Sequence, residues 1–283
     1  MTSPAADDTI KIVYETFFGL KEKPFNVTAD PNFLFFSKKH REAFDHLIYG
    51  IKERKGFLEI TGEIGTGKTT LCRALLSQLD NKTKTAFILN SNLPEVQLLL
   101  AIATDLGLMV KPRTKINLLS ELNRFLIEQL KAGSNVVLII DEAQNLKSAQ
   151  LEQIRLLSNL ETDKEKLIQI VLVGQPELKE KLDSPDLEQL RQRIAVRYHI
   201  LPLDRSEVPD YIYHRLRVAG ADGSVAFEPD AFGEIYEYSG GVPRLINLVC
   251  DRSLLFAFTM ETKAISLDMI RRSVEEIEGC VKI

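Results

Sequence analysis

Residues 62–69 read Gly62-Glu63-Ile64-Gly65-Thr66-Gly67-Lys68-Thr69, which fits the pattern G-x-x-x-x-G-K-[ST] at every fixed position. The apolar run 57–61 precedes this stretch, and a segment with helical spacing of apolar residues, 68–79, follows it. A glycine-rich turn lets the backbone approach an anion closely, and the positive end of the following helix dipole favours that anion. The stretch therefore predicts a phosphate-binding loop between a strand and a helix.

Each position of this loop has an expected task. Backbone N–H groups from Gly65 to Thr69 are expected to point at phosphate oxygens, and Lys68 to reach the β- and γ-phosphates. The hydroxyl of Thr69 is placed to hold Mg²⁺, with Thr70 behind it as an outer contact. The candidate nucleotide-binding residues of the loop are Gly62, Glu63, Ile64, Gly65, Thr66, Gly67, Lys68, Thr69 and Thr70.

A second acidic motif follows the apolar run 136–140, which ends in Asp141 and Glu142. In a parallel sheet, the carboxyl end of this strand lies on the same rim as the phosphate-binding loop. Asp141 is expected to hold Mg²⁺, and Glu142 to polarise the attacking water as a general base. The same two residues could instead only cap the helix that follows.

The pattern of the chain predicts an α/β fold with a second, helical part. Apolar runs at 57–61, 86–89, 136–140, 168–173 and 196–201 alternate with amphipathic segments at 68–79, 95–106, 118–130 and 149–160, which indicates a parallel five-stranded sheet flanked by helices. After Pro202 the pattern is helical, at 207–218, 229–238, 243–258 and 267–277. We expect a polar tail over 1–12, a nucleotide-binding domain over 13–203 and a small all-helical lid over 204–283.

Composition narrows the class of protein. The formal net charge of -4 over 283 residues gives no global attraction to nucleic acid. Cys72, Cys250 and Cys280 form no CxxC pair, which is typical of a reduced cytosolic protein without a thiolate metal site. No stretch is long and apolar enough for a secretory signal or a membrane-spanning helix. A guanine-reading Asn-Lys-x-Asp segment is missing at residues 81–84, so ATP is favoured over GTP.

Several longer stretches carry a resemblance to one family. They are Phe17-Phe18-Gly19-Leu20, Pro24-Phe25, the stretch 61–68, Asp141-Glu142-Ala143-Gln144-Asn145-Leu146, Gly174-Gln175-Pro176-Glu177-Leu178 and Gly241-Val242-Pro243-Arg244-Leu245-Ile246-Asn247. Across nearly all of its length the chain resembles the general secretion pathway protein A, or ExeA-like, family of AAA+ ATPases. The resemblance implies hydrolysis of ATP with Mg²⁺ at the subunit interfaces of a homo-oligomer, in a ring or an open arc.

The resemblance also implies roles for residues outside the two motifs. Gln175, which follows the apolar run 168–173, corresponds to the sensor-1 position. Arg193 corresponds to the arginine finger that reaches the neighbouring subunit's nucleotide, with Arg191 as the second choice. Arg244 corresponds to sensor 2. From the residues alone, the arginines could equally form surface ion pairs or bind the end of a core helix.

The N-terminal segment is implied to run past the adenine. Its candidate residues are Pro24, Phe25 and His40. Proline and aromatic residues in such a segment could also be ordinary core residues.

The resemblance implies work in an envelope system. Secretion proteins of this family continue into a membrane helix and a periplasmic part, so the chain could be a cytosolic domain or a free-standing relative serving pilus or polysaccharide export. We expect a cytoplasmic assembly or remodelling factor, recruited to the inner membrane by a protein partner. The alternative is an ATP-gated DNA-binding helper of transposition type, based on the basic clusters 38–41 and 52–55. A nucleotide-responsive scaffold without turnover is a third interpretation.

Overall fold

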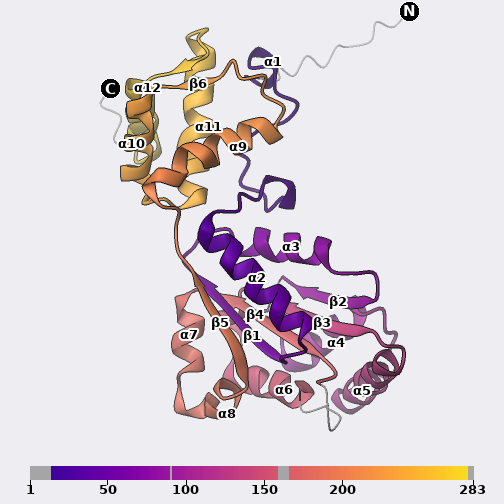
Figure 1. Ribbon diagram of the computed structural model, residues 1–283. Coiled ribbons are helices and arrows are strands. Elements are labelled where there is room, and N and C mark those ends of the chain that lie inside the picture. The colour runs from indigo at the N-terminus through magenta and orange to yellow at the C-terminus, as the bar shows by residue number, and fades with distance from the viewer. Residues whose placement is uncertain (1–13, 90, 159–165, 280–283) are drawn as a thin grey trace, which may run out of the picture. The chain divides into compact units, whose positions relative to one another are not determined.

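The computed structural model describes residues 14–89, 91–158 and 166–279. The chain forms two compact units. One comprises residues 29–202, and the other combines the chain up to Thr28 with the chain from Leu203 onward. The expected tail over 1–12 lies outside the described residues. The helices and strands of each unit are drawn in Figure 1.

A parallel five-stranded sheet forms the middle of the unit 29–202. Its strands are β1 (Phe57–Gly62), β2 (Thr83–Ile88), β3 (Asn135–Ile140), β4 (Gln169–Gly174) and β5 (Ile194–Ile200). The spatial order is β2-β3-β4-β1-β5, with every neighbouring pair parallel. This confirms the expected sheet. The order also places β4 between the strand that leads into the phosphate-binding loop and the strand that ends in the acidic pair.

Helices cover both faces of this sheet (Figure 1). They are α2 (Lys38–Lys52), α3 (Lys68–Gln78), α4 (Glu95–Asp105), α5 (Lys115–Lys131), α6 (Ser148–Ser158), α7 (Pro176–Leu182) and α8 (Glu188–Arg191), with short 3₁₀ turns η1 (Pro31–Phe33), η2 (Ala143–Asn145) and η3 (Pro185–Leu187). Leu58 and Ile60 of β1 pack with the buried side chains of α2 and α3. Side chains on the opposite face, including Leu138 and Leu172, pack against α4, α5, α6 and α7. The inner strands β1, β3 and β4 are buried along almost their whole length, as expected of strands that helices cover on both faces.

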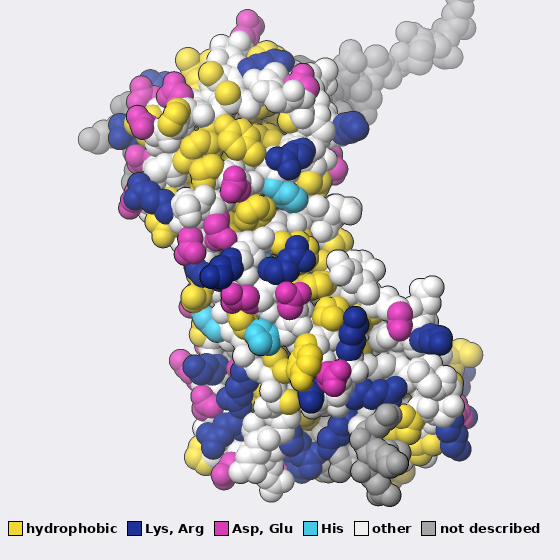
Figure 2. Space-filling model, in the orientation of Figure 1, with side chains coloured by type: hydrophobic (Ala, Val, Ile, Leu, Met, Phe, Trp, Pro, Cys, Tyr) yellow, Lys and Arg dark blue, Asp and Glu magenta, His cyan; other side chains and the backbone are white. Residues whose placement is uncertain are grey.

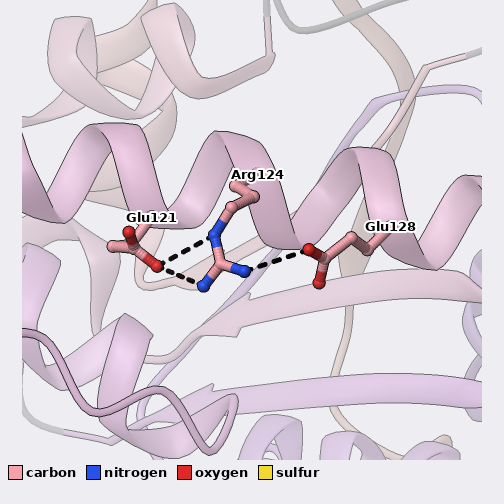
Figure 3. Close-up of polar contacts among 3 residues, drawn as sticks. All are labelled: Glu121, Arg124 and Glu128. Carbon is pink, nitrogen blue, oxygen red and sulfur yellow. Dashed lines mark hydrogen bonds and ion pairs between the residues drawn. The ribbon is translucent and has the colours of Figure 1, made fainter.

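The exposed side of α5 is stabilised by charges at helical spacing. Arg124 Nη2 lies 2.5 Å from Glu121 Oε2, and its Nη1 lies 3.1 Å from Glu128 Oε1 (Figure 3). Pairs at i,i+3 and i,i+4 of this kind contribute about 0.2–0.5 kcal/mol each to a helix. This face of α5 is therefore an ordinary solvated helix surface.

The second unit is mainly helical, as expected after Pro202. It contains α1 (Tyr14–Phe17), η4 (Arg205–Glu207), α9 (Val208–Val218), α10 (Pro229–Ser239), α11 (Pro243–Thr259) and α12 (Leu267–Ile277). A ladder of two short parallel strands, β6 (Ala226–Phe227) and β7 (Ala264–Ile265), is an addition to the expected all-helical part. Two-residue strands are too short to show an alternating pattern in the sequence. Among the described residues, none of the helices combines the length and hydropathy needed to span a bilayer.

The segment 14–28 packs with the C-terminal helices, whereas the sequence assigned it to the nucleotide-binding domain. The rings of Phe17 and Phe258 meet edge to face with centroids 5.6 Å apart. The buried guanidinium of Arg215 donates to the carbonyl oxygen of Pro24 at 2.5 Å and to that of Asn26 at 3.0 Å. A local sequence pattern cannot reveal hydrogen bonds between segments that lie so far apart in the chain. The expected start of the nucleotide-binding domain at residue 13 therefore followed the order of the segments along the chain.

Candidate functional site

The loop 62–69 joins β1 to α3 and depends on its glycines. Gly65 and Gly67 have φ of 81° and 93°, in the left-handed region that side chains rarely adopt. A Cβ atom on Gly62 would lie 2.7 Å from the carbonyl oxygen of Ile200. Gly67 is the N-cap of α3 and provides no side-chain acceptor for the first N–H groups of that helix. Within the described residues no N-cap side chain satisfies the first N–H groups of α3, so the loop presents backbone donors at a helix N-terminus, which suits an anion.

Lys68 is buried within this loop. Its Nζ donates to the carbonyl oxygen of Gly62 at 2.7 Å and to that of Glu63 at 2.8 Å. Burial lowers the pKa of Lys68, while the nearby carboxylates of Glu142 and Asp141 act in the opposite direction. The backbone carbonyl groups of the loop therefore fix the Lys68 amino group inside the loop, where the motif predicts that a phosphate binds. The Thr66 hydroxyl tightens the same turn by donating to the Glu63 carbonyl oxygen at 2.8 Å.

His40 of α2 contacts the backbone of the loop. Its Nε2 lies 2.8 Å from the carbonyl oxygen of Thr66, and its Nδ1 lies 2.7 Å from the hydroxyl of Ser37, the N-cap of α2. The side chain is buried, and a Cβ on Gly67 would lie 3.4 Å from His40 Nε2. The resemblance placed His40 beside the adenine, whereas the structure places it against the phosphate-binding loop. No spacing rule in the sequence points to this contact.

Thr69 and Asp141 meet at the head of α3. The Thr69 hydroxyl donates to Asp141 Oδ2 at 2.5 Å, and Asp141 Oδ1 accepts from the backbone N–H of Glu142 at 2.9 Å. Burial raises the pKa of Asp141, and the hydrogen bond from Thr69 opposes that rise. A hydroxyl and a carboxylate side by side are the oxygen ligands that Mg²⁺ uses together with phosphate oxygens. The two predicted metal ligands are therefore adjacent.

Glu142 has an unusual backbone and two amide partners. Its φ of 51° lies in the left-handed region. Its Oε2 accepts from Gln144 Nε2 at 2.5 Å and from Gln175 Nε2 at 3.1 Å. The Ser91 hydroxyl donates to its carbonyl oxygen at 2.7 Å. The sequence predicted that Gln175, like Glu142, lies at the carboxyl ends of the strands, but it assigned no role to Gln144 or Ser91. Gln144 stands within the quoted stretch 141–146, and this was the only signal that could have singled it out.

The remaining candidate residues lie in the turn after β1, in α3 and after β4. Glu63 and Ile64 are exposed at the tip of the turn, and Thr70 is half-buried in the first turn of α3. Gln175 follows β4 and is the N-cap residue of α7. Because β4 lies between β1 and β3, its carboxyl end brings Gln175 to the acidic pair.

The two candidate finger residues lie away from this rim. Arg193 directly precedes β5, whose first residue is level with Phe57, while Ile200 at its other end is level with Gly62. Arg193 Nη1 donates to the Ser158 hydroxyl at 3.3 Å, and Arg191 Nη1 to the Asp183 carbonyl oxygen at 3.5 Å. Since six residues of a β-strand extend over roughly 20 Å, the start of β5 lies about that far from the strand ends that carry the loop. Neither arginine belongs to the site that its own chain builds at the carboxyl ends of the strands.

Pro24, Phe25 and Arg244 belong to the other compact unit. Pro24 and Phe25 are buried there, and the Pro24 carbonyl oxygen accepts from Arg215. Arg244 is exposed in the first turn of α11, directly after Pro243. Their roles beside a nucleotide stay predictions.

Comparisons with known proteins relate the chain to nucleotide-binding ATPases. The model of the AAA domain family matches residues 51–182. General secretion pathway protein A of Aeromonas hydrophila is 46% identical over 268 residues, which cover 94% of this chain and 49% of that protein. An uncharacterized HTH-type transcriptional regulator of Methanocaldococcus jannaschii is 28% identical over 160 residues, 54% of this chain and 38% of that protein. The chain spans about half or less of these curated relatives.

Solved structures share the fold at low identity. The Aeropyrum pernix ORC2 protein superposes with a TM-score of 0.70 at 18% identity, covering 93% of this chain and 73% of that one. A chain of Drosophila ORC bound to DNA gives 0.67 at 17% identity, with 98% and 69% covered. The Thermotoga maritima RuvB Holliday junction branch migration motor gives 0.57 at 18%, with 86% and 69% covered. These likenesses concern the fold alone.

Proposed function

We propose that this chain, whose residues 51–182 match the AAA domain family and which is related to general secretion pathway protein A, hydrolyses Mg-ATP to drive assembly or remodelling of a partner complex. One observation carries the proposal. Lys68, Thr69, Asp141, Glu142 and Gln175 converge at the carboxyl ends of β1, β3 and β4. Ligands of open α/β sheets bind at this edge.

The loop binds the phosphates in this proposal. Backbone N–H groups from Gly65 to Thr69 and the ammonium of Lys68 contact the phosphate oxygens, with the helix dipole of α3 adding to the attraction. Thr69 and Asp141 hold Mg²⁺, which neutralises charge on the phosphates when it is bound. The closeness of the Thr69 hydroxyl to the Asp141 carboxylate supports this assignment.

Glu142 acts as the general base. Its carboxylate lies on the same rim as the loop and accepts the proton of the attacking water. Gln175 orients the water or the terminal phosphate with its amide, in addition to its hydrogen bond to Glu142. A mere capping role for the acidic pair is poorly supported, because Glu142 is the left-handed N-cap of η2 without a side-chain cap bond.

A neighbouring copy supplies the finger. Arg193 lies a strand length from the loop of its own chain, so it can meet a nucleotide only across a subunit contact, as a ring or an open arc would provide. A finger in trans stabilises charge on the transferring phosphoryl group and makes hydrolysis depend on assembly. Arg191 is the second choice. In the C-terminal unit, Arg244 senses the nucleotide, and Pro24 and Phe25 approach the adenine.

The task belongs to an envelope system. The relationship to general secretion pathway protein A supports a cytoplasmic ATPase that a protein partner recruits to the inner membrane, in secretion, pilus or polysaccharide export. The chain covers 49% of that protein, so the client and pathway are part of this proposal.

A DNA-binding helper has weaker support. In the cluster 38–41 the Arg41 guanidinium stacks over the Phe36 ring at 3.9 Å, and Lys39 donates to the Pro202 carbonyl oxygen at 3.4 Å. On the face shown in Figure 2, Asp and Glu side chains lie among the Lys and Arg side chains. Such mixing reduces attraction to a phosphate backbone.

The experiment compares the protein with Lys68→Ala and Glu142→Gln in steady-state ATP hydrolysis and in binding of a fluorescent ATP analogue with Mg²⁺. We expect Lys68→Ala to lose binding and Glu142→Gln to bind while hydrolysing at least ~100-fold more slowly. Binding without phosphate release by the unmodified protein would favour the scaffold interpretation. Hydrolysis that survives both substitutions would refute the assignment of the site.

A further inference from the structure

We propose that Gln144 is a positioning residue that sets which oxygen of Glu142 faces the reaction, an inference that rests on the proposed general-base role of Glu142. A general base acts only when its free oxygen points at the proton it removes. The contacts around Glu142 assign one of its two oxygens to the protein and leave the other for substrate.

The two oxygens of Glu142 have different surroundings. Oε2 accepts both amide hydrogen bonds, from Gln144 at 2.5 Å and from Gln175 at 3.1 Å. Within the part of the chain that the structure describes, no hydrogen bond reaches Oε1. A carboxylate held at one oxygen by two N–H groups keeps the second oxygen oriented and available to accept a proton.

The Gln144 amide is itself fixed at both ends. Its Nε2 donates to Glu142, while its Oε1 accepts from the backbone N–H of Gln175 at 3.2 Å. If the amide were flipped, its oxygen would face the Glu142 carboxylate and its NH₂ group would face the backbone N–H of Gln175. Only one orientation therefore satisfies both partners. The fit is also tight, since a Cβ on Gly174 would lie 2.7 Å from Gln144 Oε1.

The backbone on either side of this amide is held as well. Lys181 Nζ of α7 donates to the carbonyl oxygens of Gln144 and of Leu146, the latter at 2.7 Å. Ser91 holds the Glu142 carbonyl oxygen. With a left-handed backbone at Glu142, no regular element directs its side chain. The side-chain direction of Glu142 therefore depends on Gln144 and Gln175.

The chain offers a matched control for this role. Gln150 of α6 is a buried glutamine whose side-chain amide, like that of the half-buried Gln144, forms hydrogen bonds through both its oxygen and its nitrogen: Oε1 accepts from the Lys147 N–H at 2.7 Å, and Nε2 donates to the Leu93 carbonyl oxygen at 2.5 Å. Among the described residues, neither of these two hydrogen bonds involves a proposed catalytic group. Methionine has nearly the volume of glutamine but no donor, so Gln144→Met and Gln150→Met remove comparable bonds at two places.

The test measures kcat, KM and nucleotide affinity for these two variants. We expect Gln144→Met to lower kcat by about 10- to 100-fold, because misplacement of a catalytic group by about 1 Å has that effect, with affinity for the ATP analogue changed less than about twofold. Gln150→Met should lower the unfolding temperature and keep kcat within about twofold. Gln144→Asn, which is shorter and cannot reach both partners, serves as a second variant if the methionine variant does not fold.

Two further variants separate the positioning role from a structural one. In a Glu142→Gln background, Gln144→Met should cause no further loss of rate. The combination of Gln144→Met with Gln175→Met should lose less than the product of the two single effects, because both act on one oxygen. Normal kcat in Gln144→Met and Gln144→Asn, with Glu142→Gln inactive, overturns the positioning role alone. Full activity of Glu142→Gln overturns the general base itself.

Discussion

Thr69 and Asp141, 72 positions apart in the chain, are joined by a hydrogen bond of 2.5 Å from the threonine hydroxyl to carboxylate Oδ2. The first residue of this pair belongs to the helix after β1, and the second follows β3, with β4 between those strands. A hydroxyl oxygen and a carboxylate oxygen in contact at the edge of a sheet are suitable ligands for a hard cation such as Mg²⁺. This pair links the two motifs into one site.

The first prediction concerns magnesium. Thr69→Val keeps the shape of the side chain and removes the hydroxyl, while Thr69→Ser keeps the hydroxyl. We expect half-maximal hydrolysis of the valine variant to need about tenfold more Mg²⁺, equivalent to about 1.4 kcal/mol, and the serine variant to stay near the unmodified protein. The measurement is hydrolysis rate against Mg²⁺ concentration. Equal Mg²⁺ dependence of the two variants would exclude Thr69 as a ligand.

The second prediction concerns the finger in trans. If the proposed roles hold, Arg193→Ala should bind ATP but lack the finger, and Lys68→Ala should supply the finger but not bind ATP. Each alone should hydrolyse about 10³-fold more slowly. When the two variants are mixed, some interfaces should combine Lys68 of one subunit with Arg193 of its neighbour. The hydrolysis rate of the mixture should therefore exceed the sum of the rates of the two variants measured separately.

Controls for the finger use the other arginines. Arg191→Ala mixed with Lys68→Ala tests the second choice, and Arg124→Ala on the exposed face of α5 should leave the rate unchanged. A mixture that only sums its components, at concentrations where subunits associate, would contradict a shared site.

The third prediction concerns pH. Glu59 lies in β1 with its side chain 3% exposed, and its Oε2 is 3.4 Å from the Nε of the half-exposed Arg197. Burial raises the pKa of Glu59 above its usual 4.5, with Arg197 opposing the rise. The folded state therefore holds this proton to a higher pH than the unfolded state. The stability that Glu59 contributes is present in acid and is lost as pH rises through its folded pKa.

Glu59→Gln removes the titration. The free energy of unfolding of this variant, relative to the unmodified protein, should increase as the pH rises above 4.5 and level off once the pH exceeds the raised pKa of Glu59 in the folded state. Urea unfolding at several pH values measures it, with Glu53→Gln at the exposed end of α2 as the control. A difference that is the same at every pH would show that burial of Glu59 is not linked to a proton.

The fourth prediction compares two glycines. Gly62→Ala would put a Cβ 2.7 Å from a backbone carbonyl oxygen that cannot move easily, so we expect a cost of about 1–3 kcal/mol and weaker nucleotide binding. In Gly233→Ala, inside α10, the nearest atom is the end of the flexible Arg205 side chain at 3.2 Å. That variant should gain about 0.5–1 kcal/mol from helix propensity. Chemical denaturation measures both, and a stabilised Gly62→Ala would contradict the close approach.

The fifth prediction concerns the segment 14–28. Arg215→Met removes the donors to the Pro24 and Asn26 carbonyl oxygens, and we expect a loss of about 3 kcal/mol in unfolding free energy with faster proteolysis within this segment. Arg217→Met, on the exposed side of the same helix, should cost less than about 0.5 kcal/mol. Equal effects of the two substitutions would show that the guanidinium does not hold the segment.

Much of the site was predictable because its chemistry is local. A loop that approaches phosphate needs glycine at Gly65 and Gly67 for their backbone torsions, and both torsions are as the motif requires. The apolar run before Asp141 marks a buried strand, which was found at 135–140. The contacts of Gln144, Ser91 and His40 were not predictable, since each joins segments that no spacing rule connects.

The sequence by itself determined the five strands of the sheet, the helices α3 to α6 and α9 to α12, the phosphate-binding loop and the acidic pair that follows β3, because these follow from backbone torsions and burial within a few residues. The tertiary structure decided the order of the strands, and with it the meeting of Gln175 with Glu142 across 33 positions. It also decided that segment 14–28 packs with the C-terminal helices through Arg215, 191 positions from Pro24. Such pairings depend on which long-range arrangement buries the most apolar surface and satisfies the most polar groups, and no local stretch contains that information.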